Sequence, residues 1–161
     1  MIYQENPRQP LNGNDLSWMK EAYALALMAK SVGEVPIGAL VVSHDNRILG
    51  RGWNQVVHQH DPSAHAEINA IREASRALQN YRLENATLYV TLEPCCMCAG
   101  AMVHARIKRL VFATRDFKAG AAGSVYNLLQ GYPLNHQIQI DEGFLQQECQ
   151  ALLSDFFKDR R

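Results

Sequence analysis

The sequence predicts an α/β fold of three layers, in which a mixed central sheet of about five strands carries helices on both faces. Two observations support this prediction. Short runs rich in β-branched residues, such as 86–91 and 110–113, have the length and composition of buried strands. Longer segments, such as 16–30 and 145–156, repeat apolar residues at helical spacing. Because the two kinds of segment alternate after an initial hairpin, we expect one sheet enclosed between helices.

The chain of 161 residues is long enough for one domain, which we expect to span residues 15–161. A domain of this size buries roughly 70% of the surface that its unfolded chain exposes, so disulfide bonds are not needed for stability. Residues 1–14 are polar and rich in proline, asparagine and glutamine, and they are expected to form a flexible N-terminal leader. No internal repeat or linker divides the rest of the chain.

Composition and charge narrow the class of protein. Hydrophobic residues make up 47% of the chain and charged residues 20%, as in ordinary globular proteins. No apolar run approaches the ~20 residues of a membrane span, and the N-terminus lacks the features of a signal peptide. We therefore expect a cytoplasmic protein with no membrane partner. The net charge is zero, so overall charge gives no argument for nucleic-acid binding.

Cysteine usage fits a reducing compartment. Three of the four cysteines fall within residues 95–98, which is a spacing typical of metal binding rather than of a disulfide framework. The fourth, Cys149, shares a predicted helical face with Leu145, Leu152 and Phe156. Free cysteine behaves as a small buried hydrophobe, so Cys149 is expected to be a core residue.

The first elements follow from local spacing and turn chemistry. A helix is predicted over residues 16–30, with Asn14 or Asp15 as its cap. A hairpin follows, with strands at 36–42 and 47–53 around a turn at 44–46. The glycines of these strands permit close approach of another backbone. The polar segment 55–64 is predicted to be a loop.

The later elements alternate in type. In chain order they are predicted to be a helix that begins near His65, a strand at 86–91, a helix at 95–104, a strand at 110–113, a short strand near 138–140 and a terminal helix at 144–156. Chemically versatile residues follow the strands, namely Asn54, His65, Cys95 and Asp116. If these strands run parallel, the four residues lie beyond their carboxyl ends, where open α/β sheets place ligands.

Residues 65–67 and 94–98 together have the composition of a catalytic metal site. Cys95 and Cys98 are three positions apart, which places both sulfurs on one side of a helix and turns Cys96 elsewhere. Thiols near a helix N-terminus meet unpaired N–H groups, which favour the thiolate that zinc binds. A neutral His65 completes three protein ligands, and a hydrolytic zinc keeps its fourth position for water.

Glu67 supplies an acid beside these ligands. Residues two apart on a regular helix point about 200° from one another, so His65 and Glu67 can share a site only at a helix end. We therefore predict that His65 lies in the cap or first turn and that Glu67 faces the same cleft. Water bound to a metal there would lose a proton to Glu67, which would act as general base and acid.

Two other interpretations of these residues remain open at this point. A Cys-x-x-Cys pair in a cytosolic α/β protein can be a thioredoxin-like redox motif. Alternatively, a fourth ligand would close a structural zinc site, and the sequence offers His58, His60 or His104 for that position. The third cysteine within the pair and the separate His-x-Glu favour the catalytic interpretation.

The chain resembles the zinc-dependent cytidine deaminase superfamily, whose His-x-Glu and Pro-Cys-x-x-Cys signatures correspond to residues 65–67 and 94–98. The resemblance covers residues 15–161 and is more specific than that signature. Further blocks that resemble the bacterial tRNA-specific adenosine deaminases are Val35–Ala39, Gly52–Asn54, Asp61–Ile68, Thr91–Cys95, Cys98–Met102, Arg115–Asp116, Gly120–Ser124 and Leu152–Phe157.

This resemblance implies the cytidine-deaminase-like fold, a homodimer and one zinc ion per subunit, with no organic cofactor. It also implies hydrolytic deamination of adenosine to inosine at the wobble position of a tRNA anticodon, so the partner would be an anticodon stem-loop. Glu67 would then carry a proton to adenine N1 and later to the departing amine. The target base must leave its stack, which is least costly in a single-stranded loop.

The resemblance also assigns substrate contacts, which are Asn54, Ala66, Arg115, Asp116, Phe157 and Arg160. Asn54 would hold the target nucleoside, and its amide offers both a donor and an acceptor. Asp116 would contact a ribose hydroxyl, which distinguishes RNA from DNA. Other roles are open for these residues: Asn54 can simply end a strand, and Asp116 can pair with Arg115 or Lys118. Of Phe156 and Phe157, one is expected in the core and the other toward the RNA.

Several positions near the expected RNA surface depart from the common family pattern. They are Gln55 and Val56 after the strand, Phe117 and Ala119 in the loop after Asp116, and the acid Asp159 in the terminal tail. A cluster of basic residues between 106 and 118 offers either an RNA contact or an ordinary solvated surface.

Two alternative functions are open on the sequence alone. A deaminase of a free nucleoside, nucleotide or base, such as cytidine, deoxycytidylate or guanine, would use the same zinc ligands. A noncatalytic zinc scaffold that binds RNA is the second alternative, although Glu67 and the open coordination position argue against it.

Overall fold

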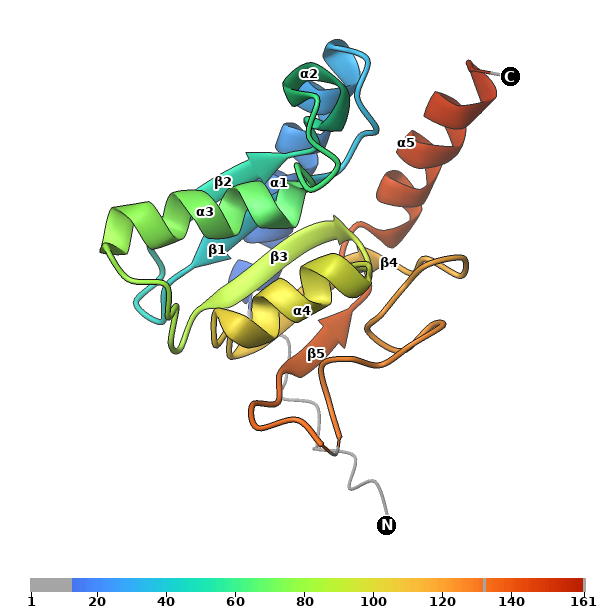
Figure 1. Ribbon diagram of the computed structural model, residues 1–161. Helices are drawn as coiled ribbons and strands as arrows, with labels where there is room; N and C mark the ends of the chain where they lie inside the picture. The colour runs from blue at the N-terminus through green and yellow to red at the C-terminus, as the bar shows by residue number, and fades with distance from the viewer. Residues whose placement is uncertain (1–12, 132, 161) are drawn as a thin grey trace.

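The computed structural model describes residues 13–131 and 133–160, and it has the mixed five-stranded sheet that the sequence predicts (Figure 1). In chain order the elements are α1 (Gly13–Ser31), β1 (Gly38–Val42), β2 (Ile48–Trp53), α2 (Val56–Gln59), α3 (Ala66–Leu78), β3 (Thr87–Leu92), α4 (Cys96–His104), β4 (Arg109–Thr114), β5 (Gln139–Glu142) and α5 (Gln146–Lys158). Of the predicted leader, residues 1–12 lie outside the described residues, and residues 13 and 14 belong to α1.

The directions of the strands place the carboxyl ends of all of them except β1 at one edge of the sheet. The sheet runs β2-β1-β3-β4-β5, in which β1 is antiparallel to both β2 and β3. Strands β3, β4 and β5 are parallel to one another. Because β2 and β3 are each antiparallel to β1, they share one direction, and β2, β3 and β4 all end at the same edge. The prediction that Asn54, His65, Cys95 and Asp116 follow co-directional strands is therefore confirmed.

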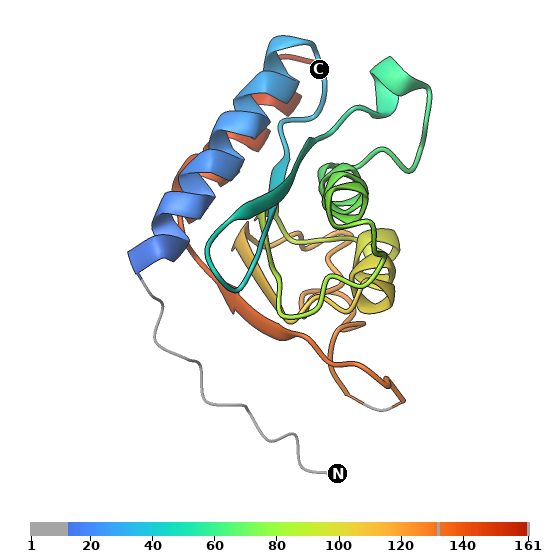
Figure 2. The ribbon, with the colours of Figure 1, turned by 90° about the vertical axis from the view of Figure 1, so that its left-hand side faces the viewer.

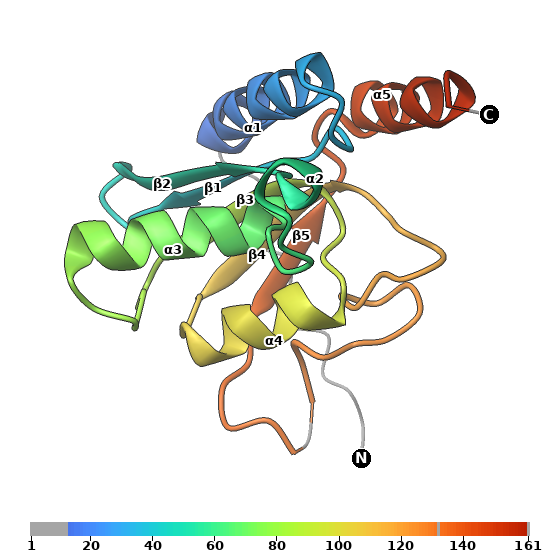
Figure 3. The same ribbon diagram turned by 45° about the horizontal axis from the view of Figure 1, so that its top comes forward.

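The helices form two layers, one on each face of the sheet. Helices α1 and α5 lie on one face, and α3 and α4 lie on the other (Figures 2 and 3). Alternation along β3 sends Leu88 and Val90 into the core beneath α3 and α4, and Tyr89 into the core beneath α1 and α5. Cys149 is 1% exposed in the second core, as its helical spacing predicts.

Glycine sets the position of α3 against the edge strand β2. A Cβ atom on Gly52 would lie 2.1 Å from the Ala66 carbonyl oxygen, and one on Gly50 would lie 2.3 Å from that of Ala70. Any larger residue would therefore push α3 off the sheet. This close packing confirms the predicted approach of a backbone to the hairpin glycines, and it fixes the N-terminus of α3, where His65 and Glu67 lie.

The structure differs from the sequence prediction mainly at the ends of elements. The segment 55–64, predicted as a loop, contains the four-residue helix α2. Helix α5 begins at Gln146 rather than Phe144, because Leu145 is a left-handed cap with φ of 56°. Strand β5 is displaced toward the C-terminus of the predicted segment and includes Asp141 and Glu142. Both carboxylates pair with arginines of other segments, which compensates for their place in a strand.

Within the described residues, no helix is both long and apolar enough to cross a membrane.

Candidate metal centre and active site

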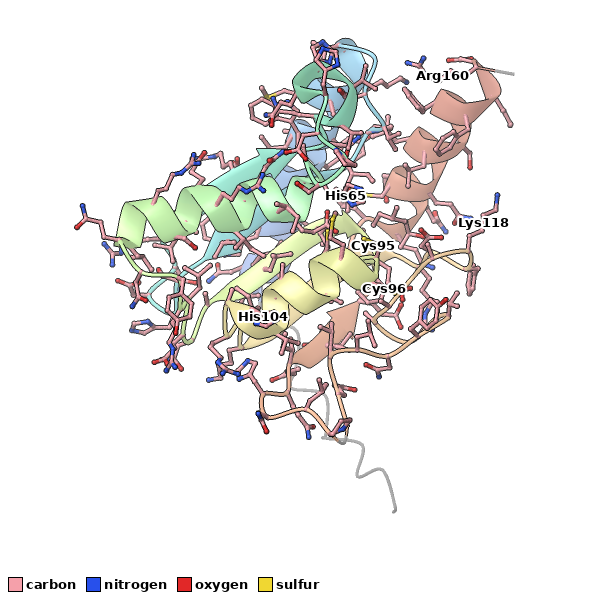
Figure 4. The ribbon with its side chains drawn as sticks, viewed as in Figure 1. His65, Cys95, Cys96, His104, Lys118 and Arg160 are labelled. Carbon is pink, nitrogen blue, oxygen red and sulfur yellow. The ribbon has the colours of Figure 1, made fainter. Side chains whose placement is uncertain are left out.

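Three side chains that could hold a metal ion converge at the common edge of the sheet. The ligand atoms of His65, Cys95 and Cys98 all lie within 4.8 Å of one another. Each sulfur lies 3.6 Å from His65 Nδ1. Figure 4 shows His65 and Cys95 next to each other where α3 and α4 begin. Two sulfurs and one imidazole nitrogen are a donor set that suits zinc.

Helix caps bring these ligands together. His65 is the N-cap of α3 and Cys95 is the N-cap of α4, and neither side chain makes a capping hydrogen bond. Their extended backbones, with ψ of 156° and 177°, lead the chain into each helix from the end of the preceding segment. Pro94 directly precedes this cap of α4. The predicted cap position of His65 is confirmed, and it explains how His65 and Glu67 share a site.

Glu67 is buried beside the three ligands. It is 4% exposed in the first turn of α3. Burial raises the pKa of Glu67, while a hydrogen bond with Cys98 and the nearby His65 imidazole act in the opposite direction. A carboxyl group with a raised pKa holds a proton more readily than an exposed one, which suits a group that both accepts and donates protons.

The two thiols differ in how easily they ionise. A hydrogen bond from Cys98 lowers the pKa of the Cys95 thiol to about 3, and the His65 imidazole acts in the same direction. The same hydrogen bond, together with burial, raises the pKa of Cys98. The bond to Cys95 also raises the pKa of His65. Metal binding by this group would therefore release protons.

The alternative histidines do not join the group. Among the described residues, His65, Cys95 and Cys98 form the only cluster of three or more side chains with metal-binding geometry. The His58 imidazole instead lies 3.0 Å from Oε1 of Glu34, and His104 is the last residue of α4. Cys96 is exposed and lies outside the cluster, as its helical position predicts.

Asn54 directly follows β2, at the same edge of the sheet as the ligand cluster. Its neighbour Gln55 donates its backbone N–H to the Ala64 carbonyl, one residue before His65. The Asn54 side chain is 6% exposed, and its Nδ2 donates to Oε2 of Glu34 at 3.2 Å. Ala66 is also buried, and its carbonyl oxygen packs against Gly52.

In the loop after β4, Asp116 and Arg115 have different hydrogen-bond partners. Asp116 Oδ1 accepts hydrogen bonds from the backbone N–H groups of Lys118 and Ala119, so it stabilises a turn and makes no ion pair with Lys118. Arg115 makes two hydrogen bonds to the carboxylate of Glu142 at the end of β5. That pairing raises the pKa of Arg115.

Of the two aromatic residues of the terminal helix α5, one is buried and the other is exposed, as the sequence predicts. Phe156 is 6% exposed, whereas Phe157 is 50% exposed. The Arg160 guanidinium lies 4.0 Å over the Phe156 ring and donates through Nη2 to the Gly33 carbonyl. The end of α5 is thereby joined to the turn that follows α1, which Figure 2 shows beside the C-terminus.

Part of the basic cluster 106–118 is structural. Arg109 donates a bidentate pair of hydrogen bonds to the two carboxylate oxygens of Asp15, each at 2.8 Å. Its Nε donates to Asp141. The Tyr89 hydroxyl donates to the same Asp15 carboxylate. Since Arg115 is also paired, the cations of this cluster that remain for another molecule are the partly buried Arg106 and the exposed Lys108 and Lys118.

Two buried acids near the site were missed by the sequence reasoning. Glu34 is 1% exposed and Glu93 is 3% exposed. Glu93 accepts hydrogen bonds from the backbone N–H groups of Asp116, Ala122 and Ser124, and from the Ser124 hydroxyl. The available signal was the position of each acid, because Glu34 precedes the apolar start of β1 and Glu93 separates β3 from Pro94.

Comparison with known proteins shows that the chain is similar to deaminases over most of its length. The family model of the MafB19-like deaminases matches residues 13–161. The tRNA-specific adenosine deaminase of Haemophilus influenzae is 50% identical over 147 residues, which are 91% of this chain and 85% of that protein. The Bacillus subtilis protein of the same name is 47% identical, with 91% of each chain covered.

A solved structure gives the same result for the fold. It comes from a study of A-to-I editing by tRNA:A34 deaminases at the wobble position of transfer RNA. The two chains superpose with a TM-score of 0.82 and 40% identity, and the match covers 85% of this chain and 99% of the other. With the ligand cluster and the fold in agreement, this chain belongs to the MafB19-like deaminases and to the family of tRNA-specific adenosine deaminases.

Proposed function

We infer that this protein is an enzyme that converts adenosine to inosine at the wobble position of a tRNA anticodon, with release of ammonia. One observation carries this conclusion. At the N-termini of α3 and α4, a cluster of three possible metal ligands lies beside a buried glutamate. Relatives that share about half of the residues are tRNA-specific adenosine deaminases. The proposed substrate is therefore an anticodon stem-loop rather than a free nucleoside.

The donor set fits one zinc ion per subunit. His65, Cys95 and Cys98 are three protein ligands, one fewer than a structural zinc takes. A zinc ion held there would act as a Lewis acid toward water and would supply the nucleophile that adds to adenine C6. The thiol pair favours ionisation of Cys95, which prepares the cluster for a cation.

Glu67 is proposed to handle the protons of the reaction. Deamination at C6 needs a proton at adenine N1, which makes C6 more electrophilic, and another on the departing amine. Glu67 is the buried acid next to the ligands, so it can hold a proton out of bulk solvent and deliver it at both positions.

The other contacts place the nucleotide. We propose that Asn54 binds the target nucleoside and that Asp116 contacts a ribose hydroxyl, with Arg115 holding the Asp116 loop against Glu142. We also propose that Ala66, the buried residue between His65 and Glu67, contacts the substrate. The half-exposed Phe157 offers a surface on which a base can stack. Arg160 uses one N–H group on Gly33, and its other donors remain for phosphate.

We also propose a cellular location and an oligomeric state for the protein. The proposed site needs reduced thiols, which the cytoplasm maintains. We propose that residues 15–161 act as one domain and pair as a homodimer. Exposed apolar side chains around the start of α4 support that pairing, namely Met97, Val125 and Tyr126. Analytical ultracentrifugation would give twice the 18.1 kDa chain mass for the dimer and the single mass if the pairing is wrong.

An anticodon stem-loop assay tests the proposed function. The zinc-loaded full chain is incubated with a stem-loop that carries a wobble adenosine, and with free adenosine, cytidine and guanine in parallel. Inosine and ammonia from the stem-loop alone would support the proposal. Turnover of free substrates alone would indicate a nucleoside or base deaminase, and tight RNA binding without turnover would indicate a scaffold.

A further inference from the structure

Glu34 is a buried acid to which neither the ligand cluster nor the proposed chemistry assigns a role. It lies in the turn after α1 and is 1% exposed, although a buried carboxylate costs free energy unless hydrogen bonds replace its water. In the part of the chain that the structure describes, its only ion-pair partner is the half-exposed imidazole of His58. A buried acid with so little charge compensation calls for a reason other than stability.

The hydrogen bonds of Glu34 converge from the two segments that follow β2. Oε2 accepts from Asn54 Nδ2 at 3.2 Å. Oε1 accepts from the backbone N–H of His58 at 2.8 Å and lies 3.0 Å from His58 Nδ1. These contacts join the turn after α1 to the end of β2 and to α2. Both carboxylate oxygens of Glu34 therefore act as hydrogen-bond acceptors.

This pattern decides which end of the Asn54 amide faces the site. An asparagine amide has a donor end and an acceptor end of nearly equal size, and packing alone distinguishes them poorly. A carboxylate oxygen accepts hydrogen bonds, so the NH₂ group of Asn54 faces Glu34, as the 3.2 Å contact shows, and Oδ1 is left for a donor. A ribose hydroxyl or a base N–H group is such a donor.

We propose that Glu34 is a positioning residue, which fixes the Asn54 amide so that Oδ1 accepts a hydrogen bond from the target nucleoside. This proposal rests on the proposed function. Glu34 also contacts α2 through His58, so one carboxylate connects Asn54, α2 and the turn after α1 as a hydrogen-bonded unit. Arg160 extends the unit to the end of α5, because its Nη2 donates to the carbonyl of Gly33, the residue before Glu34.

The first experiment compares Glu34→Gln with the wild type in stem-loop turnover. A glutamine can present its own NH₂ group to Asn54, which favours the flipped amide and removes the acceptor from the nucleoside. We expect kcat/KM to fall about tenfold, with zinc content unchanged, since one hydrogen bond of about 1.4 kcal/mol is lost. The matched control is Glu84→Gln, the same change at a side chain that is 64% exposed, and it should leave kcat/KM unaltered.

A double-mutant cycle with Asn54→Ala separates positioning from general loss of structure. If Glu34 acts through Asn54, Glu34→Gln should change kcat/KM less than about twofold once Asn54 is alanine. An equal, tenfold fall in both backgrounds would overturn the proposal, because it would show that the two residues act independently.

Hydrogen exchange of the Asn54 side-chain NH₂, followed by NMR, tests the contact without any turnover. Exchange should be slow in the wild type and at least about tenfold faster in Glu34→Gln. In Glu34→Asp, which keeps the charge but withdraws the carboxylate by one methylene, it should also be faster. Unchanged exchange in both variants would refute the positioning role. If the wild type shows slow exchange but no stem-loop turnover, the proposed function fails and the Glu34–Asn54 contact stands.

Discussion

Glu67 and Glu73 lie on the same helix, but their surroundings differ in the way that matters for proton transfer. Glu67 is 4% exposed beside the ligand cluster. Glu73 is exposed and accepts a hydrogen bond from the backbone N–H of Arg51. The residue types alone could predict His65, Glu67, Cys95 and Cys98, because each has chemistry that few other side chains supply. The position of Glu34 before β1 was a signal, but its contacts could not be predicted, because its partners are 20 and 24 positions away and only the fold brings them together.

Replacement of Glu67 by glutamine should abolish catalysis and leave the metal site in place. The amide cannot accept and return protons, so we expect kcat on the stem-loop to fall by about 10²–10⁴. Zinc content, measured by atomic absorption, should stay at the wild-type value because Glu67 is not one of the three ligands. Glu73→Gln is the matched control and should retain wild-type kcat. A Glu67→Gln enzyme that still turns over at near-normal rate would remove Glu67 from its assigned role.

At the scale of elements, the segments at the carboxyl ends of the strands are held by contacts that the apolar pattern of the sequence does not predict. Apolar patterns predicted the five strands and four of the helices, because the helices bury one face and the central strands are buried along nearly their whole length. It could not predict α2, which has no buried residue, or the conformation of the 116–124 loop. That loop is held by Glu93 through three backbone N–H groups, so its shape depends on one carboxylate from the end of β3.

Replacement of Glu93 by alanine should therefore destabilise the protein and loosen this loop. Three backbone donors would lose their acceptor, and we expect the free energy of unfolding to fall by about 3 kcal/mol or more. Chemical denaturation would measure the change. Glu84→Ala, at an exposed position, should shift the unfolding free energy by less than about 0.5 kcal/mol. Equal stability of the two variants would show that Glu93 does not hold the loop.

At the scale of the whole molecule, one buried network ties the two ends of the fold together. Asp15 of α1, Tyr89 of β3, Arg109 of β4 and Asp141 of β5 are joined by hydrogen bonds of 2.6 to 2.8 Å. The sequence predicted the α/β class and its layers because these follow from periodicity. The network was not predicted, because the basic cluster that contains Arg109 was interpreted as an RNA contact or a solvated surface.

The network predicts a loss of stability at high pH. Burial and the neighbouring Asp15 raise the pKa of Tyr89 in the folded state, so folding favours its neutral form. This contribution is complete below the unfolded pKa of about 10 and is lost as the pH rises through the folded value. In thermal unfolding from pH 8 upward, Tyr89→Phe should therefore lose stability less steeply than the wild type above about pH 10.

The exposed Tyr81, replaced by phenylalanine, is the control for that measurement. It is 66% exposed, so Tyr81→Phe should follow the wild-type curve. Parallel curves for Tyr89→Phe and the wild type would mean that Tyr89 does not couple folding to pH.

The most direct test of the metal site is a zinc titration of the metal-free full chain, with inosine formed in the stem-loop as the signal. Activity should rise in proportion to added zinc and level off at one equivalent per chain, because His65, Cys95 and Cys98 form one site. Cys96→Ser should give the same curve, and Cys98→Ser should remain inactive. Full activity without zinc, or an undiminished curve for Cys98→Ser, would contradict the assignment.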